Sequence, residues 1–169
     1  VGKIVYTQWL NEAGGIEADM TITRLATDRF MIFSACVSER RDWFWLSKRA
    51  ARFDCDVSQD RETAIIGVMG PKSTRLLTAI CDDPDQAERI DYYTSALLTA
   101  GDITFRANRL SYVGERGFEL YMPPQKATKP WQRLLGAGAP LTLRAARFHA
   151  MNACRLDKGY RHWGDATHH

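Results

Sequence analysis

Three short apolar segments joined by tight turns occupy the first 36 residues, and they constrain the fold more than any other feature. Residues 3–10 are rich in β-formers and end at the turn sequence Asn-Glu-Ala-Gly-Gly. From Ile16 onward apolar and polar residues alternate, and residues 30–36 are almost wholly apolar. Because the connections are short, we predict that these strands pair as an antiparallel meander.

The rest of the chain mixes short strand patterns with helical ones. Further strands are predicted at residues 53–58, 64–69, 103–105, 109–113 and 118–122. Helices are predicted at residues 39–51, 125–136 and 143–157 and directly after Gly70-Pro71, with Ser38 as an N-cap of the first. Gly114-Glu-Arg-Gly117 is predicted to be a hairpin turn. Helices inserted between antiparallel strands indicate an α+β fold of antiparallel sheets with packed helices.

Length and composition exclude several classes of protein. A chain of 169 residues, 45% hydrophobic and 25% charged, is typical of one globular domain or two small lobes. The acidic stretch Asp82-Asp83-Pro84-Asp85 is predicted to be a loop, with a possible lobe boundary near residues 82–90. No apolar window is long enough to span a bilayer, so no membrane partner is expected. The net charge of +3 is dispersed, which argues against nucleic acid as a partner.

The cysteines and the chain ends carry further expectations. The cysteines are far apart and lie in apolar stretches, so we predict buried free thiols and a reducing compartment; they are Cys36, Cys55, Cys81 and Cys154. No spacing of ligand residues indicates a metal site. The chain begins at Val1 inside a strand pattern, so we expect a piece of a longer protein. His168 and His169 are interpreted as an expression remnant.

Asp19 is the first candidate for chemistry. A carboxylate on a strand beside apolar neighbours would be desolvated if it faced a closed pocket. The alternative is that Asp19 lies on a solvated face with Glu17 and Thr21, and periodicity alone favours this alternative.

The segment from Ser111 to Tyr121 is the second candidate. A glutamate such as Glu119, beside a tight turn, can accept two parallel hydrogen bonds from a planar amino-heterocycle. The alternative is a hairpin whose polar residues face water. Aromatic rings could stack on the same heterocycle, although burial statistics favour a place in the core; these aromatic residues are Tyr6, Trp43, Tyr92, Tyr93 and Trp163.

Several strings, taken in order, resemble a known family. They are Gly14-Gly-Ile-Glu-Ala-Asp19, Gly67-Val-Met-Gly-Pro-Lys72, Tyr112-Val-Gly-Glu-Arg-Gly-Phe-Glu119 and Arg155-Leu-Asp-Lys-Gly-Tyr-Arg-His-Trp-Gly164. Together they resemble the tetrahydrofolate-binding aminomethyltransferase family (glycine-cleavage T-protein). They are most similar to the folate domains of dimethylglycine and sarcosine dehydrogenases. Lys158-Gly-Tyr-Arg lacks the cysteine of the related iron–sulfur assembly branch, which argues against that branch.

The resemblance implies a fold and a set of site residues. The fold would be the aminomethyltransferase folate-binding fold with two pseudo-repeated lobes, of which residues 1–169 are a fragment truncated at both ends. Asp19 matches the catalytic aspartate beside the reactive nitrogen of the folate. The implied folate-binding residues are Tyr6, Ser34, Tyr92, Tyr112 and Glu119. Arg155 is expected to bind the anionic glutamate tail of the folate. Glu119 matches the residue that grips the pterin, and Ser34 stands where T-proteins often carry an asparagine.

The resemblance also implies an enzymatic function. A one-carbon unit would pass from an amine or iminium to tetrahydrofolate, giving 5,10-methylenetetrahydrofolate, in a larger dimethylglycine or sarcosine dehydrogenase-like or glycine-cleavage enzyme. The partners would be the folate, the amine-derived donor and the missing domains. FAD is expected in a domain outside this chain, and the isolated fragment is expected to be inactive. The expected location is the cytoplasm, or the mitochondrial matrix in a eukaryote. The alternative is a non-catalytic folate-binding or interaction module of the same fold.

Overall fold

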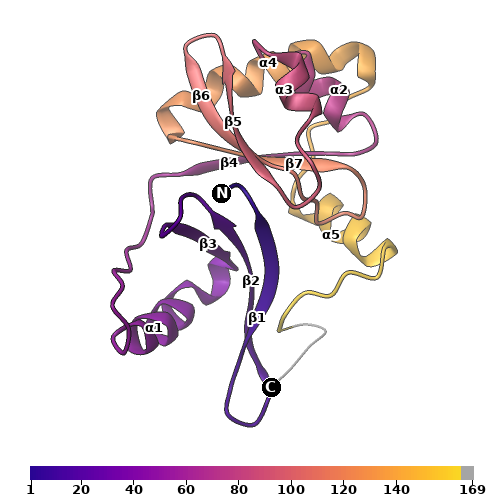
Figure 1. The fold of residues 1–169 in the computed structure, drawn as a ribbon. Helices are drawn as coiled ribbons and strands as arrows, with labels where there is room; N and C mark the ends of the chain where they lie inside the picture. The colour runs from indigo at the N-terminus through magenta and orange to yellow at the C-terminus, as the bar shows by residue number, and fades with distance from the viewer. Residues whose placement is uncertain (165–169) are drawn as a thin grey trace. The chain divides into compact units, whose positions relative to one another are not determined.

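The computed structural model describes residues 1–164 and divides the chain into two compact units (Figure 1). The first unit holds Val1, Lys3–Arg61 and the chain from His162 onward. The second holds Gly2 and Glu62–Arg161. The proposed expression remnant at the C-terminus lies outside the described residues. No helix in residues 1–164 is long and apolar enough to cross a membrane.

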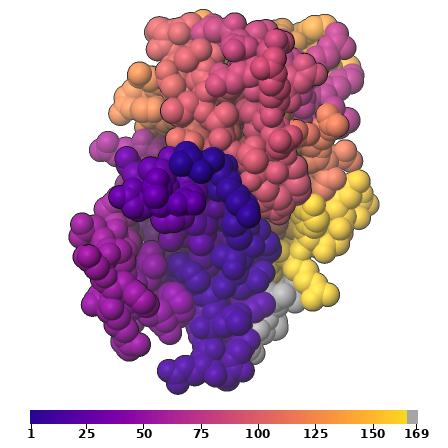
Figure 2. Space-filling model, viewed as in Figure 1, coloured from indigo at the N-terminus to yellow at the C-terminus, as the bar shows by residue number. Residues whose placement is uncertain are grey.

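The first unit contains the predicted meander. Strands β1 (Ile4–Leu10), β2 (Ile16–Arg24) and β3 (Phe30–Ser34) form an antiparallel sheet in the order β1-β2-β3. The first turn forms because the Asn11 side chain accepts hydrogen bonds from two backbone N–H groups of that turn, at 3.0 and 2.8 Å. Gly14 supplies the left-handed conformation there, with φ of 82°. Strand β1 is an edge strand, and its indigo atoms lie at the surface in Figure 2.

Helix α1 (Glu39–Ala50) packs on one face of this sheet. The Trp9 ring of β1 stacks on the Trp45 ring of the helix, with centroids 4.5 Å apart and planes 7° apart. The predicted third strand is shorter than expected, because residues Cys36–Ser38 form a 3-10 turn leading into the helix. Ser38 occupies the N-cap position, but its hydroxyl makes no capping bond to the helix backbone.

One predicted strand of the first unit is wrong. Residues 53–58 have no regular structure, although Phe53, Cys55 and Val57 alternate with polar residues. Phe53 is 72% exposed, so this alternation does not bury an apolar face. A two-residue period forms a strand where a neighbouring strand accepts its hydrogen bonds, and this segment pairs with none.

The second unit contains an antiparallel sheet in the order β4-β7-β6-β5. Its strands are β4 (Ala64–Met69), β5 (Ser95–Ala100), β6 (Ile103–Asn108) and β7 (Gly117–Met122). The sequence missed β5, and the predicted strand over residues 109–113 is wrong. The hairpin partner of β7 is β6, so the connection is an eight-residue loop and not the predicted tight turn.

The second unit also contains four helices. They are α2 (Ser73–Thr78), α3 (Pro84–Glu88), α4 (Thr128–Gly138) and α5 (Phe148–Asp157), with 3-10 turns at Pro124–Lys126 and Ala139–Leu141. Helices α2, α3 and α4 contribute side chains to the core on the apolar face of the sheet of this unit. The core includes Leu77 of α2, Leu134 of α4, and Phe105 and Leu120 of the sheet. The predicted helix after Gly70-Pro71 begins two residues after the proline.

The acidic stretch is part of a helix start and not a simple loop. The Asp83 carboxylate accepts a hydrogen bond from the Gln86 backbone N–H at 3.0 Å, and proline occupies the first turn of α3. Residues 82–90 therefore lie inside the second unit, and the two units divide after Arg61.

The cysteines differ from the prediction. All four are free, but only Cys81 is buried, while Cys36, Cys55 and Cys154 are exposed. Burial raises the pKa of Cys81 to about 11, and the neighbouring carboxylates of Asp82 and Asp83 act in the same direction. The Cys81 thiol is therefore an inert part of the core.

Candidate functional site

The sheet of the first unit brings Tyr6 and Asp19 together. Tyr6 pairs with Thr21, and Asp19 lies two residues earlier on the same strand, so both side chains share one face. The Tyr6 hydroxyl donates a hydrogen bond to Asp19 Oδ2 at 2.7 Å. The predicted pairing of these two residues in one site is therefore geometrically possible.

The face that carries Asp19 is not a simple solvent face. Asp19 is half-buried, whereas Thr23 and its cross-strand partner Ile4 on the same face are fully buried. Trp9 points to the opposite face, where it stacks on Trp45 of α1. The alternative prediction, that this face of β2 is exposed to solvent, is therefore wrong for the C-terminal end of β2.

Ser34 does not join this pair. Its cross-strand partner is Met20, which lies between Asp19 and Thr21 and points to the other face of the sheet. The side chain of Ser34 is exposed there. Phe33, which pairs with Thr21, stands on the face of Tyr6 and Asp19 instead. The sequence motifs do not indicate this difference, because a shift of one residue in the strand register moves a side chain to the other face of the sheet.

Glu119 lies in the middle of β7, on the face opposite the apolar core. Its carboxylate is half-buried and accepts a hydrogen bond from the Tyr121 hydroxyl. Burial raises the pKa of Glu119, and the hydrogen bond from Tyr121 offsets part of that rise. Burial and the adjacent carboxylate together raise the pKa of Tyr121 far above its ordinary value, so its hydroxyl stays a donor.

Tyr112 and Tyr92 lie in loops of the second unit. The Tyr112 hydroxyl lies 3.5 Å from the Arg161 carbonyl oxygen, and its ring centroid is 6.3 Å from that of Tyr160. Tyr92 is 56% exposed and meets Tyr93 edge to face, with centroids 4.4 Å apart. Burial of its hydroxyl, then the hydrogen bond with Tyr93, raise the pKa of Tyr92. The core interpretation is wrong for Tyr92, and likewise for Tyr6, which is 48% exposed.

The loop at Tyr93 holds a strained backbone. Tyr93 adopts φ of 57°, a conformation that side chains disfavour. Its N–H donates to the Arg109 carbonyl oxygen at 2.9 Å, and the Arg109 guanidinium donates to the Ile90 carbonyl oxygen at 2.5 Å. These bonds hold the backbone at Tyr93, which follows Tyr92 directly, in this conformation.

Arg155 is buried and braces the end of α5. Its Nε donates to Asn152 Oδ1 at 2.7 Å, and its Nη1 donates to the Tyr160 carbonyl oxygen at 2.9 Å. With 4% of its surface exposed, the guanidinium is not the surface cation expected for an anionic ligand tail. Its implied role in folate binding stays a prediction.

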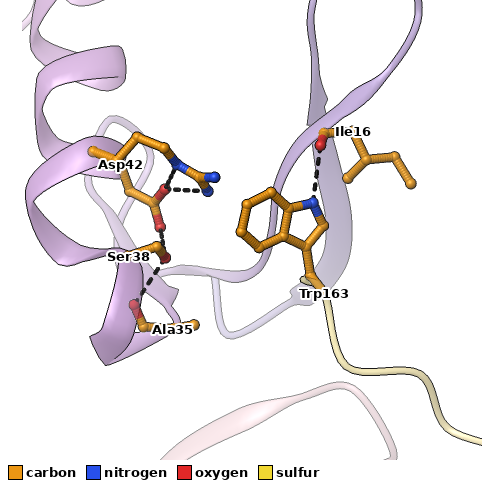
Figure 3. Close-up of polar contacts among 6 residues, drawn as sticks. Ile16, Ala35, Ser38, Asp42 and Trp163 are labelled. Carbon is orange, nitrogen blue, oxygen red and sulfur yellow. Dashed lines mark hydrogen bonds and ion pairs between the residues drawn. The ribbon is translucent and has the colours of Figure 1, made fainter. Parts of the chain in front are cut away.

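A further cluster was missed by sequence reasoning (Figure 3). Trp163 Nε1 donates to the Ile16 carbonyl oxygen at 2.9 Å, and the Arg41 guanidinium lies 3.9 Å from the centroid of the Trp163 ring. Arg41 also donates to the buried Asp42 carboxylate, at 2.9 and 3.2 Å, and the Ser38 hydroxyl donates to Asp42 at 2.6 Å. We call these residues the Trp163 anchor. It ties the end of the described chain to the start of β2, 147 positions earlier.

Half-buried Trp43 takes no part in this anchor. The Tyr6–Asp19 pair belongs to the first unit and Glu119 to the second. Among the described residues, no three His, Cys, Asp or Glu side chains stand together as a cluster that could hold a metal ion.

Comparison with known proteins places this geometry in context. The chain matches the GCVT N-terminal domain over residues 1–169. The chain belongs to this family. It is 40% identical over 96% of its length to 4-methylaminobutanoate oxidase (formaldehyde-forming) of Paenarthrobacter nicotinovorans, and it covers 20% of that protein. It is 29% identical to human mitochondrial sarcosine dehydrogenase, of which it covers 19%.

Aminomethyltransferases are also relatives of this family member. The chain is 29% identical to the aminomethyltransferase of Thermotoga maritima over 96% of its own length and 44% of that enzyme. The crystal structure of glycine cleavage system aminomethyltransferase T from Bartonella henselae superposes with a TM-score of 0.81 at 26% identity. That match covers 95% of this chain and 42% of the other, so the α+β fold with two antiparallel sheets is shared. The chain spans less than half the length of these relatives.

Proposed function

We propose that this chain is the tetrahydrofolate-binding domain of a larger amine-demethylating enzyme, and that it takes part in one-carbon transfer to give 5,10-methylenetetrahydrofolate. The observation that carries this proposal is the environment of Glu119. A half-buried carboxylate on a sheet face, oriented by a buried hydroxyl, suits the recognition of a planar, forked donor. Membership of the GCVT N-terminal domain family supports the same function.

The residues present fit a reduced folate. A pterin ring carries an N–H group and an amino group side by side, and a carboxylate can accept both hydrogen bonds. Gly67 lies directly opposite Glu119 on β4, so the residue at that register position adds no side chain beside the carboxylate. The half-exposed rings of Tyr92 and Tyr112 offer flat surfaces on which a heterocycle can stack.

Asp19 is the proposed catalytic residue. The bound folate supplies the amine nitrogen that accepts the one-carbon unit. Asp19 can orient that nitrogen and accept its proton, and a carboxylate also stabilises positive charge that develops nearby. The Tyr6 hydroxyl donates to one oxygen of this carboxylate, Oδ2, at 2.7 Å. Holding both reactants in place supplies the remaining acceleration.

The relatives support placement of this chain in a longer enzyme. Since it covers only about one fifth of the oxidase and of sarcosine dehydrogenase, we propose that the amine substrate and FAD bind in other domains. Ser34 and Arg155 remain proposed folate contacts, although Ser34 lies on the sheet face opposite Asp19 and Arg155 is buried. For the cellular location we propose the cytoplasm, or the mitochondrial matrix in a eukaryote; the human relative is named as mitochondrial.

A non-catalytic folate-binding module is the second candidate. The relative with 40% identity is named formaldehyde-forming, which describes release of the one-carbon unit as free formaldehyde. A domain that binds folate without accelerating transfer would be compatible with that product.

One experiment separates the two candidates. The intact enzyme that contains this chain is supplied with its amine substrate, with and without tetrahydrofolate, and both formaldehyde and 5,10-methylenetetrahydrofolate are quantified. Transfer predicts that the folate product replaces formaldehyde and that Asp19→Ala restores formaldehyde while folate still binds. A wild-type enzyme that binds folate but releases all of its one-carbon product as formaldehyde supports the non-catalytic module. Absence of folate binding by folded protein rejects both.

A further inference from the structure

A directed series of hydrogen bonds ends at Glu119. Asn108 of β6 and Tyr121 of β7 are both buried, at 0% and 4% exposure. Asn108 is the cross-strand partner of Glu119, and Tyr121 follows Glu119 by two residues on the same strand. All three side chains therefore share the sheet face that lies away from the apolar core.

The direction of each bond follows from the chemistry of the groups. Asn108 and Tyr121 are joined by a side-chain hydrogen bond. A phenol has one proton, and the proton of Tyr121 goes to Glu119 Oε2. Tyr121 Oη can therefore only accept from Asn108, and the Asn108 amide N–H is the donor. The hydroxyl is thus fixed in one rotamer before any ligand arrives.

With the Tyr121 hydroxyl fixed, the Glu119 carboxylate can still accept hydrogen bonds from a second partner. A carboxylate has about four acceptor positions, and Tyr121 occupies one of them. On the opposite flank, a Cβ built on Gly67 would meet only Met69 Cε, at 3.6 Å, among the described residues. Glu119 is therefore held by Tyr121 on its own strand, and its register partner on β4, Gly67, has no side chain.

We propose that Tyr121, itself held by Asn108, is a positioning residue that orients the Glu119 carboxylate for a planar amino-heterocycle. The inference deepens the proposed function and rests on it, because the heterocycle is the pterin of that function. Tyr121 closes the candidate segment Ser111–Tyr121 but is not among the implied folate-binding residues, and it acts through Glu119 without needing to touch the ligand.

Charge supports the same role. A forked N–H donor requires the ionised carboxylate, whereas burial favours the neutral acid. The bond from Tyr121 shifts this balance back toward the ionised form. The groups facing Glu119 from the adjacent strands are Gly67 of β4 and Asn108 of β6, neither of which titrates. The charged group on the same face of β6 is Arg106, the cross-strand partner of Tyr121, whose guanidinium donates to the Ser95 hydroxyl of β5 at 3.0 Å.

The test compares Tyr121→Phe with a matched control, Tyr160→Phe. Calorimetric titration of the intact enzyme with tetrahydrofolate, from about pH 5 to about pH 8, gives the Kd and its dependence on protonation. Tyr121→Phe is expected to weaken binding roughly tenfold and to move the acidic loss of binding to higher pH. Tyr160→Phe is expected to change neither quantity. A structural role alone would lower stability without moving the pH midpoint of binding.

A ligand-free measurement keeps the inference separate from the proposed function. Carbon-13 NMR of labelled glutamate carboxyls follows the titration of Glu119, assigned by its loss in Glu119→Gln. Tyr121→Phe should raise the Glu119 midpoint, and Asn108→Ala should raise it by less, because the hydroxyl then loses its orientation and not its proton. An unchanged midpoint and unchanged Kd in folded Tyr121→Phe overturn the inference. If the wild-type enzyme binds no folate while the midpoint moves, the proposed function fails and the orientation of Glu119 by Tyr121 stands.

Discussion

The Trp163 anchor predicts that one side chain near the end of the described chain stabilises the first unit. In Trp163→Phe the aromatic ring stays over Arg41, but the hydrogen bond to the Ile16 carbonyl is lost. In Trp163→Ala the ring is lost as well. The two variants therefore separate the hydrogen bond from the ring contacts.

The magnitudes follow from the contacts. A hydrogen bond of this kind contributes about 1 kcal/mol, so Trp163→Phe should lower the free energy of unfolding by about that amount. The cation–π contact with Arg41 contributes about 1 kcal/mol, and half-burial of the ring adds about 1 kcal/mol. Trp163→Ala should therefore cost about 3 kcal/mol, which is a large share of the stability of a small unit.

Urea unfolding followed by circular dichroism, together with hydrogen exchange of the β1 and β2 amides, measures these effects. Trp131→Ala in α4 is the matched control: it removes a partly exposed tryptophan of the second unit and should leave exchange in β2 unchanged. A double-mutant cycle of Arg41→Ala with Trp163→Ala isolates the ring–guanidinium coupling, expected at about 1 kcal/mol. If both Trp163 variants unfold like the wild type, or if they are equally destabilised, the anchor does not act as described.

Three further predictions concern the proposed site. Asp19→Ala in the intact enzyme should lower the rate of transfer at least a hundredfold with little change in folate Kd, and Tyr6→Phe should lower it less; equal losses of rate and affinity would make Asp19 a binding residue. Gly67→Val should weaken folate binding more than tenfold in calorimetry without unfolding the sheet, since a Cβ there meets only Met69 Cε among the described residues, at 3.6 Å, and wild-type affinity would show that the ligand does not approach this flank. The pKa of Glu119 is raised in the folded state, so the stability that its protonation contributes is lost as the pH rises from 4.5, the ordinary pKa, through the folded pKa. Glu119→Gln should therefore flatten the pH dependence of the urea unfolding midpoint over that window. A pH dependence equal to that of the wild type would contradict this prediction.

The elements that sequence reasoning predicted well are those whose signals are local. The meander follows from alternation and from a turn that Asn11 closes with its own side chain. Strand β5 was missed because its sequence, Ser-Ala-Leu-Leu-Thr-Ala, contains helix formers and no β-branched run. Residues 109–113 look like a strand, yet Leu110 and Val113 are buried in a loop that bonds back to Tyr93 and Thr94. Tertiary packing, not local pattern, decides both cases.

For the candidate site residues too, local sequence signals predict some of the arrangement, and long-range strand pairing decides the rest. The shared face of Tyr6 and Asp19 requires the register between two strands, which a thirteen-residue spacing and a short turn nearly fix. Glu119 and Tyr121 share a face by strand periodicity alone. Asn108 and Gly67 reach Glu119 from strands whose pairing is long-range, and no local signal indicates them. The register also turns Ser34 away from Asp19, which motif matching could not detect.

The two carboxylates proposed to act on the folate, one in each unit, have different surroundings. Glu119 is held by a buried hydroxyl whose own orientation is set by a second buried group, so its geometry is fixed from within the sheet. Asp19 is held by the phenol of Tyr6, an exposed residue on an edge strand, so its partner can rearrange when a ligand arrives. A rigid acceptor suits recognition, which gains affinity from preorganisation, whereas proton transfer requires a carboxylate that can exchange one hydrogen-bond partner for another. Removal of Glu119 should therefore act mainly on Kd and removal of Asp19 mainly on turnover, and a reversed pattern would exchange their roles.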